Sequence, residues 1–155
     1  MNVADVALQL DVGISDGAWT LLGPGFFCDL PVGLLVLGGD RVGQPFELAV
    51  PNLHDHHLVF VARPVDAEQL DIRPAPNQQV VDEVVYEDDA TGLQIRCLEF
   101  AYNHDGARWR QRMYGVPLSP GTSLVVVAQA TDPHAEALFI TADELVFTIS
   151  PATSD

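Results

Sequence analysis

The residues best suited to bind a metal stand together in His54-Asp55-His56-His57. In an extended segment His54 and His56 would share a face, and two imidazoles on one face suit a transition metal. A third ligand would have to come from the fold, because no suitably spaced ligand follows in the sequence. We therefore favour a polar turn here and expect no bound metal or cofactor. The alternative, a small metal-dependent enzyme or a ligand-binding protein that uses His54, His56 and His57, stays open.

A second group of chemically capable residues alternates along the chain at Arg108, Arg110 and Arg112. They are three of the seven basic residues, and the chain contains no lysine. On a strand they would share one face, with Glu99 opposite Arg112. The simplest interpretation is charge balance in a solvated network, worth about 0.2–1 kcal/mol per pair. The functional interpretation makes Arg108, Arg110, Arg112 and Glu99 a partner-binding surface, since a planar guanidinium binds carboxylates in a bidentate manner.

Motifs for nucleophilic and phosphate chemistry are missing from the sequence. No Gly-x-Ser-x-Gly elbow occurs, and a phosphate loop ending in lysine is excluded because lysine is absent. Cys28 and Cys97 lie far apart without Cys-x-x-Cys spacing, so we expect buried thiols. The acidic run Glu83–Asp89 is interpreted as a solvated face at a strand end and turn. We assign no catalytic residue, and the sequence favours a non-enzymatic protein.

The element that positions the arginines is a hairpin over residues 93–116. Asp105-Gly106 is a favoured pair for a two-residue turn of type I′. This turn would place Tyr102 opposite Trp109, Leu98 opposite Met113 and Glu99 opposite Arg112. One face then carries mostly apolar and aromatic side chains, and the other carries the arginines with Glu99.

Other elements follow from the hydrophobic period. Short extended segments bounded by Gly and Pro are expected at residues 6–12, 19–22, 26–30, 34–37, 46–50, 58–62 and 124–128, with a long loop over the proline-rich residues 64–76. Residues 133–149 predict an amphipathic helix that starts at Asp132-Pro133. Its apolar stripe is Leu138, Ala142, Leu145 and Ile149, and a helical wheel places Glu136, Asp143 and Glu144 away from it. Two strands are the alternative for this segment, because it is rich in residues that favour sheets.

These elements define the expected fold class. With 155 residues and no linker, residues 1–155 are expected to form a single α+β domain. We expect an antiparallel sheet, or two packed sheets, of about seven to nine strands with a C-terminal helix. An all-β sandwich or barrel is the alternative if the last segment is extended.

The last third of the chain carries a family resemblance. Its hairpin contains a Gly-x-x-x-x-Gln-Arg pattern from Gly106 to Arg112, and a strand and a closing helix follow. In this pattern and order, residues 93–150 resemble the C-terminal half of the DcrB-like and PsbP-like family of α/β sandwiches, which includes chaperones that load effectors onto the type VI secretion system. The family's long helix between earlier strands is not predicted, because residues 64–77 are rich in proline. The resemblance implies a non-enzymatic protein that binds another protein.

Charge narrows the class of partner. Seven basic and 22 acidic residues give a net charge of −15, which disfavours nucleic acid and anionic membranes. The first residues lack the basic and apolar regions of a secretory signal, so we expect a cytoplasmic location. Strong negative charge steers association with basic partners. The sequence predicts a non-catalytic, cytoplasmic protein-binding module with an acidic surface, such as an adaptor, an effector chaperone or a toxin-neutralising partner, whose partner has a basic surface.

Overall fold

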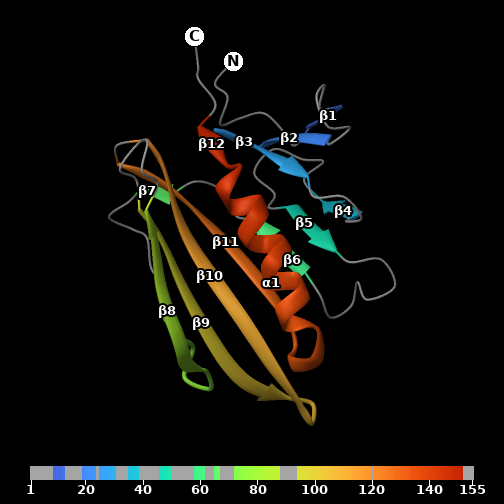
Figure 1. Cartoon of the computed structure of the whole chain (residues 1–155), viewed down its shortest axis with the longest axis vertical. Coiled ribbons are helices and arrows are strands. Elements are labelled where there is room, and N and C mark those ends of the chain that lie inside the picture. Colours follow the sequence, from blue (N-terminus) through green and yellow to red (C-terminus); the bar gives the residue numbers. More distant parts are fainter. Residues whose placement is uncertain are drawn as a thin grey trace.

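The computed structural model describes residues 9–12, 19–23, 25–30, 35–38, 46–49, 58–61, 65–66, 72–87, 94–119 and 121–151. Their strands form two antiparallel sheets, and one helix joins the sheets (Figure 1). In spatial order the larger sheet contains β4 (Leu35–Gly38), β5 (Phe46–Ala49), β6 (Leu58–Val61), β11 (Thr122–Thr131), β10 (Ala107–Ser119), β9 (Gln94–His104) and β8 (Gln79–Glu87), and β7 (Val65–Asp66) pairs with one end of β11. The smaller sheet contains β1 (Gln9–Val12), β2 (Trp19–Gly23), β3 (Phe26–Leu30) and β12 (Ser150–Pro151).

The hairpin formed by β9 and β10 has the register expected from its turn. Asp105 and Gly106 have φ angles of 50° and 77°, as a type I′ turn requires at both central positions. Tyr102 is paired with Trp109, Leu98 with Met113 and Glu99 with Arg112. The prediction of this hairpin is confirmed.

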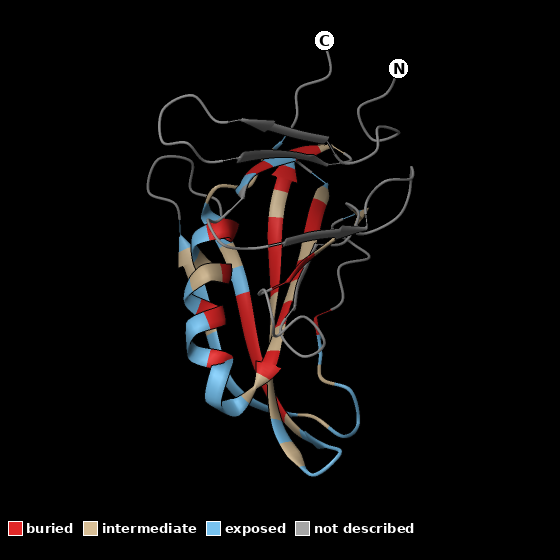
Figure 2. Cartoon of the chain, turned by 90° about the vertical axis from the view of Figure 1, so that its right-hand side faces the viewer, coloured by how far each residue is buried: buried red, intermediate tan, exposed pale blue. Residues whose placement is uncertain are grey.

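The sheet formed by β8–β11 has two different faces because side chains alternate along each strand. The helix face carries Cys97, Glu99 and Ala101 of β9, Arg110, Arg112 and Tyr114 of β10, and Val126, Ala128 and Ala130 of β11. The opposite face carries Leu98, Phe100 and Tyr102 of β9, Trp109, Gln111 and Met113 of β10, and Val127 and Gln129 of β11. Helix α1 (Asp132–Phe147) covers only the first of these faces (Figure 2).

The core lies between α1 and the helix face. Leu138, Phe139 and Leu145 of α1 are buried there, and Phe26 and Cys28 bring β3 into the same cluster. The alanines of β11 and of α1 let the helix approach the sheet closely, because their side chains add little volume. A smaller cluster of Ile72, Leu98 and Phe100 lies on the opposite face.

The helix differs from its prediction at both ends. It spans residues 132–147 instead of 133–149, and its N-cap is Thr131, so that Pro133 stands within the first turn. Leu138, Ala142 and Leu145 are buried as predicted. Ile149 is half-buried and lies beyond the helix. The helix ends before it because the Thr148 and Ile149 amides donate to the Leu145 and Val146 carbonyls, three residues back, and so close the last turn.

Two further differences concern strands. The described residues hold twelve strands, more than expected, partly because β7 and β12 have only two residues each. The sequence predicts a strand end and turn for the acidic run, but residues 83–87 belong to the nine-residue strand β8. This strand lacks a clear apolar period because most of its side chains are exposed on both faces. The α+β fold class with two antiparallel sheets and a C-terminal helix is confirmed, and the all-β alternative is wrong.

Candidate functional site

The predicted site residues Glu99, Arg110 and Arg112 meet on the helix face. Arg110 donates to Glu99 Oε2 from Nε at 3.2 Å and from Nη2 at 3.0 Å, and Arg112 Nε donates to Glu99 Oε1 at 3.1 Å. The Glu99 side chain is only 7% exposed. Its carboxylate is therefore enclosed and satisfied by two cations, which is the arrangement a buried charge requires.

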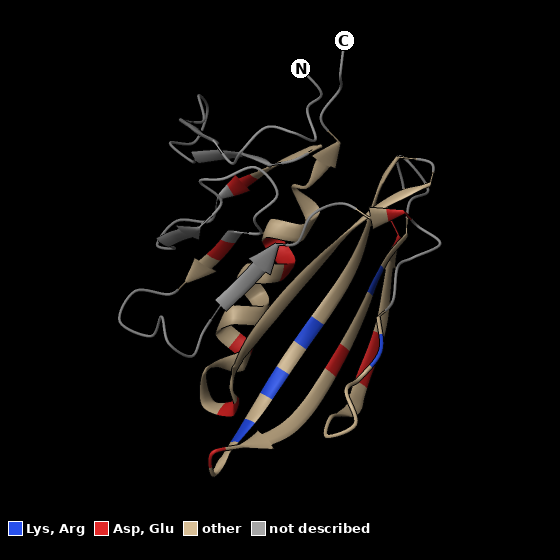
Figure 3. Ribbon diagram, turned by 180° about the vertical axis from the view of Figure 1, so that it is seen from behind, with Lys and Arg blue, Asp and Glu red and all other residues tan. Residues whose placement is uncertain are grey.

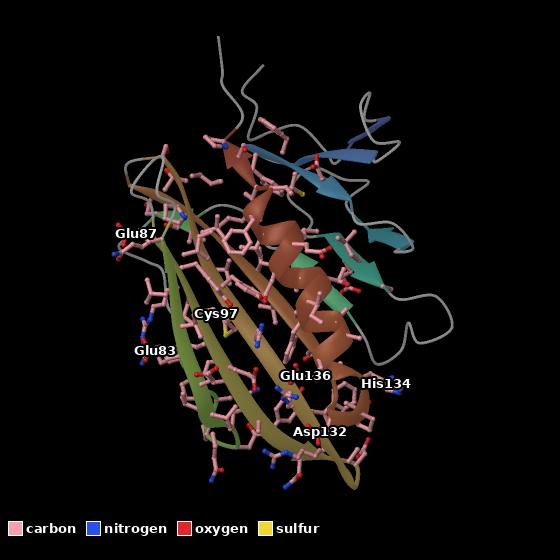
Figure 4. The ribbon with its side chains drawn as sticks, in the orientation of Figure 1. Glu83, Glu87, Cys97, Asp132, His134 and Glu136 are labelled. Carbon is pink, nitrogen blue, oxygen red and sulfur yellow. The ribbon has the colours of Figure 1, made fainter. Side chains whose placement is uncertain are left out.

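Helix α1 completes this charged cluster from the other side. Asp143 accepts two bonds of 3.1 Å from Arg112 Nη1 and a further bond from the Tyr114 hydroxyl. Glu136 lies 2.8 Å from Arg110 Nη2, and Asp132 and Glu136 both lie at the end of α1 that meets β10 (Figure 4). Asp143 was expected to face away from the apolar stripe, and it instead reaches across the edge of that stripe to the sheet.

Phe139 of α1 packs against the guanidinium groups of Arg110 and Arg112. Its ring centroid lies 4.5 Å from Arg112 Cζ and 5.3 Å from Arg110 Cζ, within cation–π range. Burial alone would lower the pKa of Arg112, but Tyr114, Asp143 and Glu99 outweigh burial and raise it. Burial, followed by the bond to Asp143, raises the pKa of Tyr114. Neither side chain exchanges a proton near neutral pH, so the charged cluster is suited to holding the helix on the sheet.

The two thiols are free and buried, as predicted. Burial raises the pKa of Cys97 to about 12, although Arg112 opposes the shift. Burial, with the Asp29 charge, raises the pKa of Cys28 to about 12 as well. Because the thiolate is the reactive species, neither cysteine is a nucleophile near neutral pH.

The remaining predicted residues lie apart from this cluster. Arg108 is exposed near the hairpin turn, where its register partner is Asn103. Figure 3 shows basic residues gathered along β10 and acidic residues on α1, β8 and β9. The partner-binding role of the arginines and Glu99 stays a prediction. His54, His56 and His57 fall outside the described residues, and within those residues no group of three or more His, Cys, Asp or Glu could hold a metal ion.

Strand β8 presents an exposed edge, of which the sequence indicates only a solvated acidic face. It is the last strand of the larger sheet, and among the described residues only β9 pairs with it. Val80, Val81 and Val85 are each about half exposed, at 49%, 46% and 52%. Glu83 and Glu87 lie along β8 (Figure 4), and Glu83 accepts a 3.2 Å bond from Arg96 of the neighbouring strand β9. The edge therefore combines exposed apolar groups with carboxylates.

A cavity of about 620 Å³ lies on the opposite face, beside the hairpin turn. The described residues that line it are Tyr102, His104, Asp105, Ala107, Trp109, Gln129 and Thr131. The rings of Tyr102 and Trp109 are nearly parallel, with an interplanar angle of 12° and centroids 6.3 Å apart. Tyr102 donates to Gln129 Oε1 at 3.2 Å, and burial raises the pKa of its hydroxyl.

The sequence predicts the pairing of Tyr102 with Trp109 but carries no signal for this cavity. The missing signal was the register of the third strand, which pairs Trp109 with Thr131 and Gln111 with Gln129. Only this register brings Gln129 and Thr131 beside the aromatic pair.

No helix within the described residues is long and apolar enough to cross a membrane.

Comparisons with known proteins inform the fold alone. No protein-family model matches the chain, and no curated protein matches it. Among solved structures the chain is similar to the solution structure of cyanobacterial PsbP (CyanoP) from Synechocystis sp. PCC 6803. The TM-score is 0.53 at 11% sequence identity, and the match covers 94% of this chain and 93% of that chain. The PsbP-like part of the expected resemblance is thus supported as a fold, and it extends well beyond residues 93–150.

Proposed function

We propose that this chain is a non-catalytic protein-binding module whose partner adds an extended, basic segment to the edge of β8. The observation that carries the proposal is the exposed edge itself, where three half-exposed valines stand among carboxylates. Edge strands offer backbone donors and acceptors to an incoming strand, and side-chain contacts then supply specificity.

The charge on β8 selects the kind of partner. Asp82, Glu83 and Glu87 would face like charges if two copies of β8 paired, which disfavours self-association. A strand with Lys or Arg opposite these residues would form cross-strand pairs of opposite charge. The net charge of −15 would also accelerate the encounter with a basic partner.

Several cellular roles are forms of this proposal. An adaptor, an effector chaperone and a toxin-neutralising partner would all bind a protein in this way, and the resemblance of residues 93–150 favours the chaperone. A cytoplasmic location belongs to the same proposal. Arg108, which is exposed near the hairpin turn, is proposed as a second partner contact. Arg110, Arg112 and Glu99, which are mostly enclosed beneath the helix, would lie at the edge of that second contact.

The test uses synthetic strands and matched charge reversals. A peptide that alternates Val with Lys should bind the full chain, and the same peptide with Glu for Lys should not. Glu87→Lys should weaken binding more than Glu144→Lys, which makes the same change in net charge on the exposed side of α1. Calorimetric titration at low and high salt measures each affinity. Failure of the basic peptide to bind, or equal effects of the two reversals, would contradict the edge-strand proposal.

The alternative predicted from the sequence is a small metal-dependent enzyme or a ligand-binding protein that uses His54, His56 and His57. These residues lie outside the described residues, so elemental analysis is the direct test. Stoichiometric zinc or iron in protein purified without added metal, lost in His54→Ala, would favour that alternative over a binding module.

A further inference from the structure

The cavity beside the hairpin turn has the size and lining of a small-molecule site. Its volume of about 620 Å³ falls within the range of about 300–1,000 Å³ that is typical of ligand pockets. Two aromatic rings from neighbouring strands form part of its wall, and β11 adds an amide and a hydroxyl. Such pockets combine apolar surface with a few polar groups that orient a ligand.

The parallel rings favour a flat ligand. Tyr102 and Trp109 are fixed as register partners on rigid strands, and the Tyr102 hydroxyl is bonded to Gln129. Planar compounds stack on aromatic faces with little loss of conformational freedom in the protein, because these side chains are already ordered.

Charge around the cavity favours a cation. The faces of aromatic rings are electron-rich, and Asp105 places a carboxylate that is 88% exposed at the rim. His104 lies 3.3 Å from that carboxylate, so the one basic group in the described lining already has an acidic neighbour. The net charge of −15 concentrates cations near the surface and repels anions.

We propose that the cavity lined by Tyr102, Trp109, Gln129 and Asp105 binds a planar organic cation. The ring system of the ligand stacks on the aromatic wall, and its positive charge lies toward Asp105. This site uses the opposite face of the sheet near the turn and shares no residue with the proposed edge-strand contact, so either proposal can fail without the other.

The test compares three bicyclic probes of similar size: N-methylquinolinium, which is cationic, quinoline, which is uncharged near neutral pH, and a naphthalene sulfonate, which is anionic. The chain has two tryptophans, so its ¹H–¹⁵N NMR spectrum should contain two indole signals, and the signal lost in Trp109→Phe belongs to Trp109. The cation should shift this signal in a saturable manner. It should leave the other indole signal unchanged.

Two variants separate charge from stacking. Asp105→Asn removes the carboxylate, and asparagine also tolerates the positive φ of this turn position, so the hairpin is retained. This variant should weaken cation binding about two- to fivefold, the range for an exposed charge pair. Trp109→Leu should weaken it about tenfold. Glu144→Gln removes the same charge at an exposed position of α1, which belongs to neither proposed site, and is the control that should leave the affinity unchanged.

The outcomes decide the proposal. Preferential binding of the cation, reduced by Asp105→Asn and unaffected by Glu144→Gln, supports it. Equal binding of all three probes would show a non-selective apolar cleft and overturn it. The absence of a saturable Trp109 shift, or preference for the anion, would overturn it as well.

Discussion

Glu99 illustrates how one residue can connect a sheet to the helix above it. An enclosed carboxylate loses its hydration, which costs several kcal/mol unless charged donors replace the water. Two arginines provide these donors here, and each arginine also binds an acidic residue of α1. The helix is therefore bound to the sheet by alternating charges, from Glu99 of β9 through the arginines of β10 to the acidic residues of α1. Apolar burial in the adjacent core is not directional, whereas these ion pairs require a particular geometry.

The first residue-scale prediction concerns this carboxylate. Glu99→Gln should lower the free energy of unfolding by about 2–4 kcal/mol, because two enclosed guanidinium groups lose their shared counter-charge. Glu83→Gln is the matched control, since its pair with Arg96 is about half exposed and such pairs are worth about 0–1 kcal/mol. Urea unfolding measures both variants. Equal losses in the two would show that the charged cluster contributes no more than a surface pair.

Sequence could predict only half of this cluster. The Asp105-Gly106 turn fixes the hairpin register, and the register places Glu99 opposite Arg112. Asp143 and Tyr114 could not be added, because their meeting depends on where α1 lies on the sheet and on its rotation about its axis. The helical wheel gives only the angle of Asp143 from the stripe, whereas the long Arg112 and Tyr114 side chains extend from the sheet to its carboxylate at the border of the buried side.

At the scale of elements, α1 owes its state to packing more than to intrinsic propensity. Its Ile, Phe, Val and Thr residues favour strands, yet Leu138, Ala142 and Leu145 recur at helical spacing and are all buried. Thr148 follows the last residue of the helix and connects it to the smaller sheet. Its hydroxyl donates a hydrogen bond to the Leu145 carbonyl and accepts one from the Asp29 amide of β3.

The element-scale prediction tests this packing. Leu145→Ala should lower the free energy of unfolding by about 2–5 kcal/mol, because Leu145 is 1% exposed and its loss leaves a cavity beneath the helix. Ile140→Ala removes a side chain that is 61% exposed on the same helix and should change stability by less than about 0.5 kcal/mol. Thermal unfolding of both variants provides the measurement. A similar loss in each would mean that burial beneath the helix is not what sets the contribution of Leu145, since alanine has the higher helix propensity at both positions.

Strands with a strong local sequence signal could be predicted, and strands without one could not. β9 and β10 were predictable because a two-residue turn with a strong preference joins them. β8 was assigned only in part, because an exposed edge strand has no buried face to impose an alternating pattern. The cavity was missed for a related reason. It needs the register of β11, and the apolar segment 124–128 indicates that a strand is present without fixing which residues pair.

At the scale of the whole molecule, the chain order and the spatial order differ. β11 lies between β10, its neighbour in sequence, and β6, which precedes it by about sixty residues. Pairings of this kind depend on long-range packing, for which a single sequence carries no local signal. The expectation that residues 1–155 form one domain stays a prediction, although β3 and α1 contribute to the same core cluster.

The last prediction concerns the excess of negative charge over the whole chain. A net charge of −15 on 155 residues repels itself in the folded state more than in the expanded unfolded state, and salt screens this repulsion. The described arginines of the charged cluster are mostly enclosed, so salt weakens their pairs less. The thermal midpoint should therefore rise as ionic strength increases from about 0.01 M to about 0.15 M, where the Debye length falls from about 30 Å to about 8 Å.

Lowering the pH provides the control for this prediction, because the net charge approaches zero near the sequence pI of about 4.3. If screening of the net charge causes the rise in thermal midpoint with salt, that rise should become smaller as the pH is lowered toward the pI. Sodium and potassium chloride should act alike, since screening depends on ionic strength and not on the identity of the ion. A midpoint that falls with added salt at neutral pH would mean that the ion pairs between α1 and β10 outweigh the global repulsion. The main effect of charge on the stability of this fold would then come from the charged cluster around Glu99.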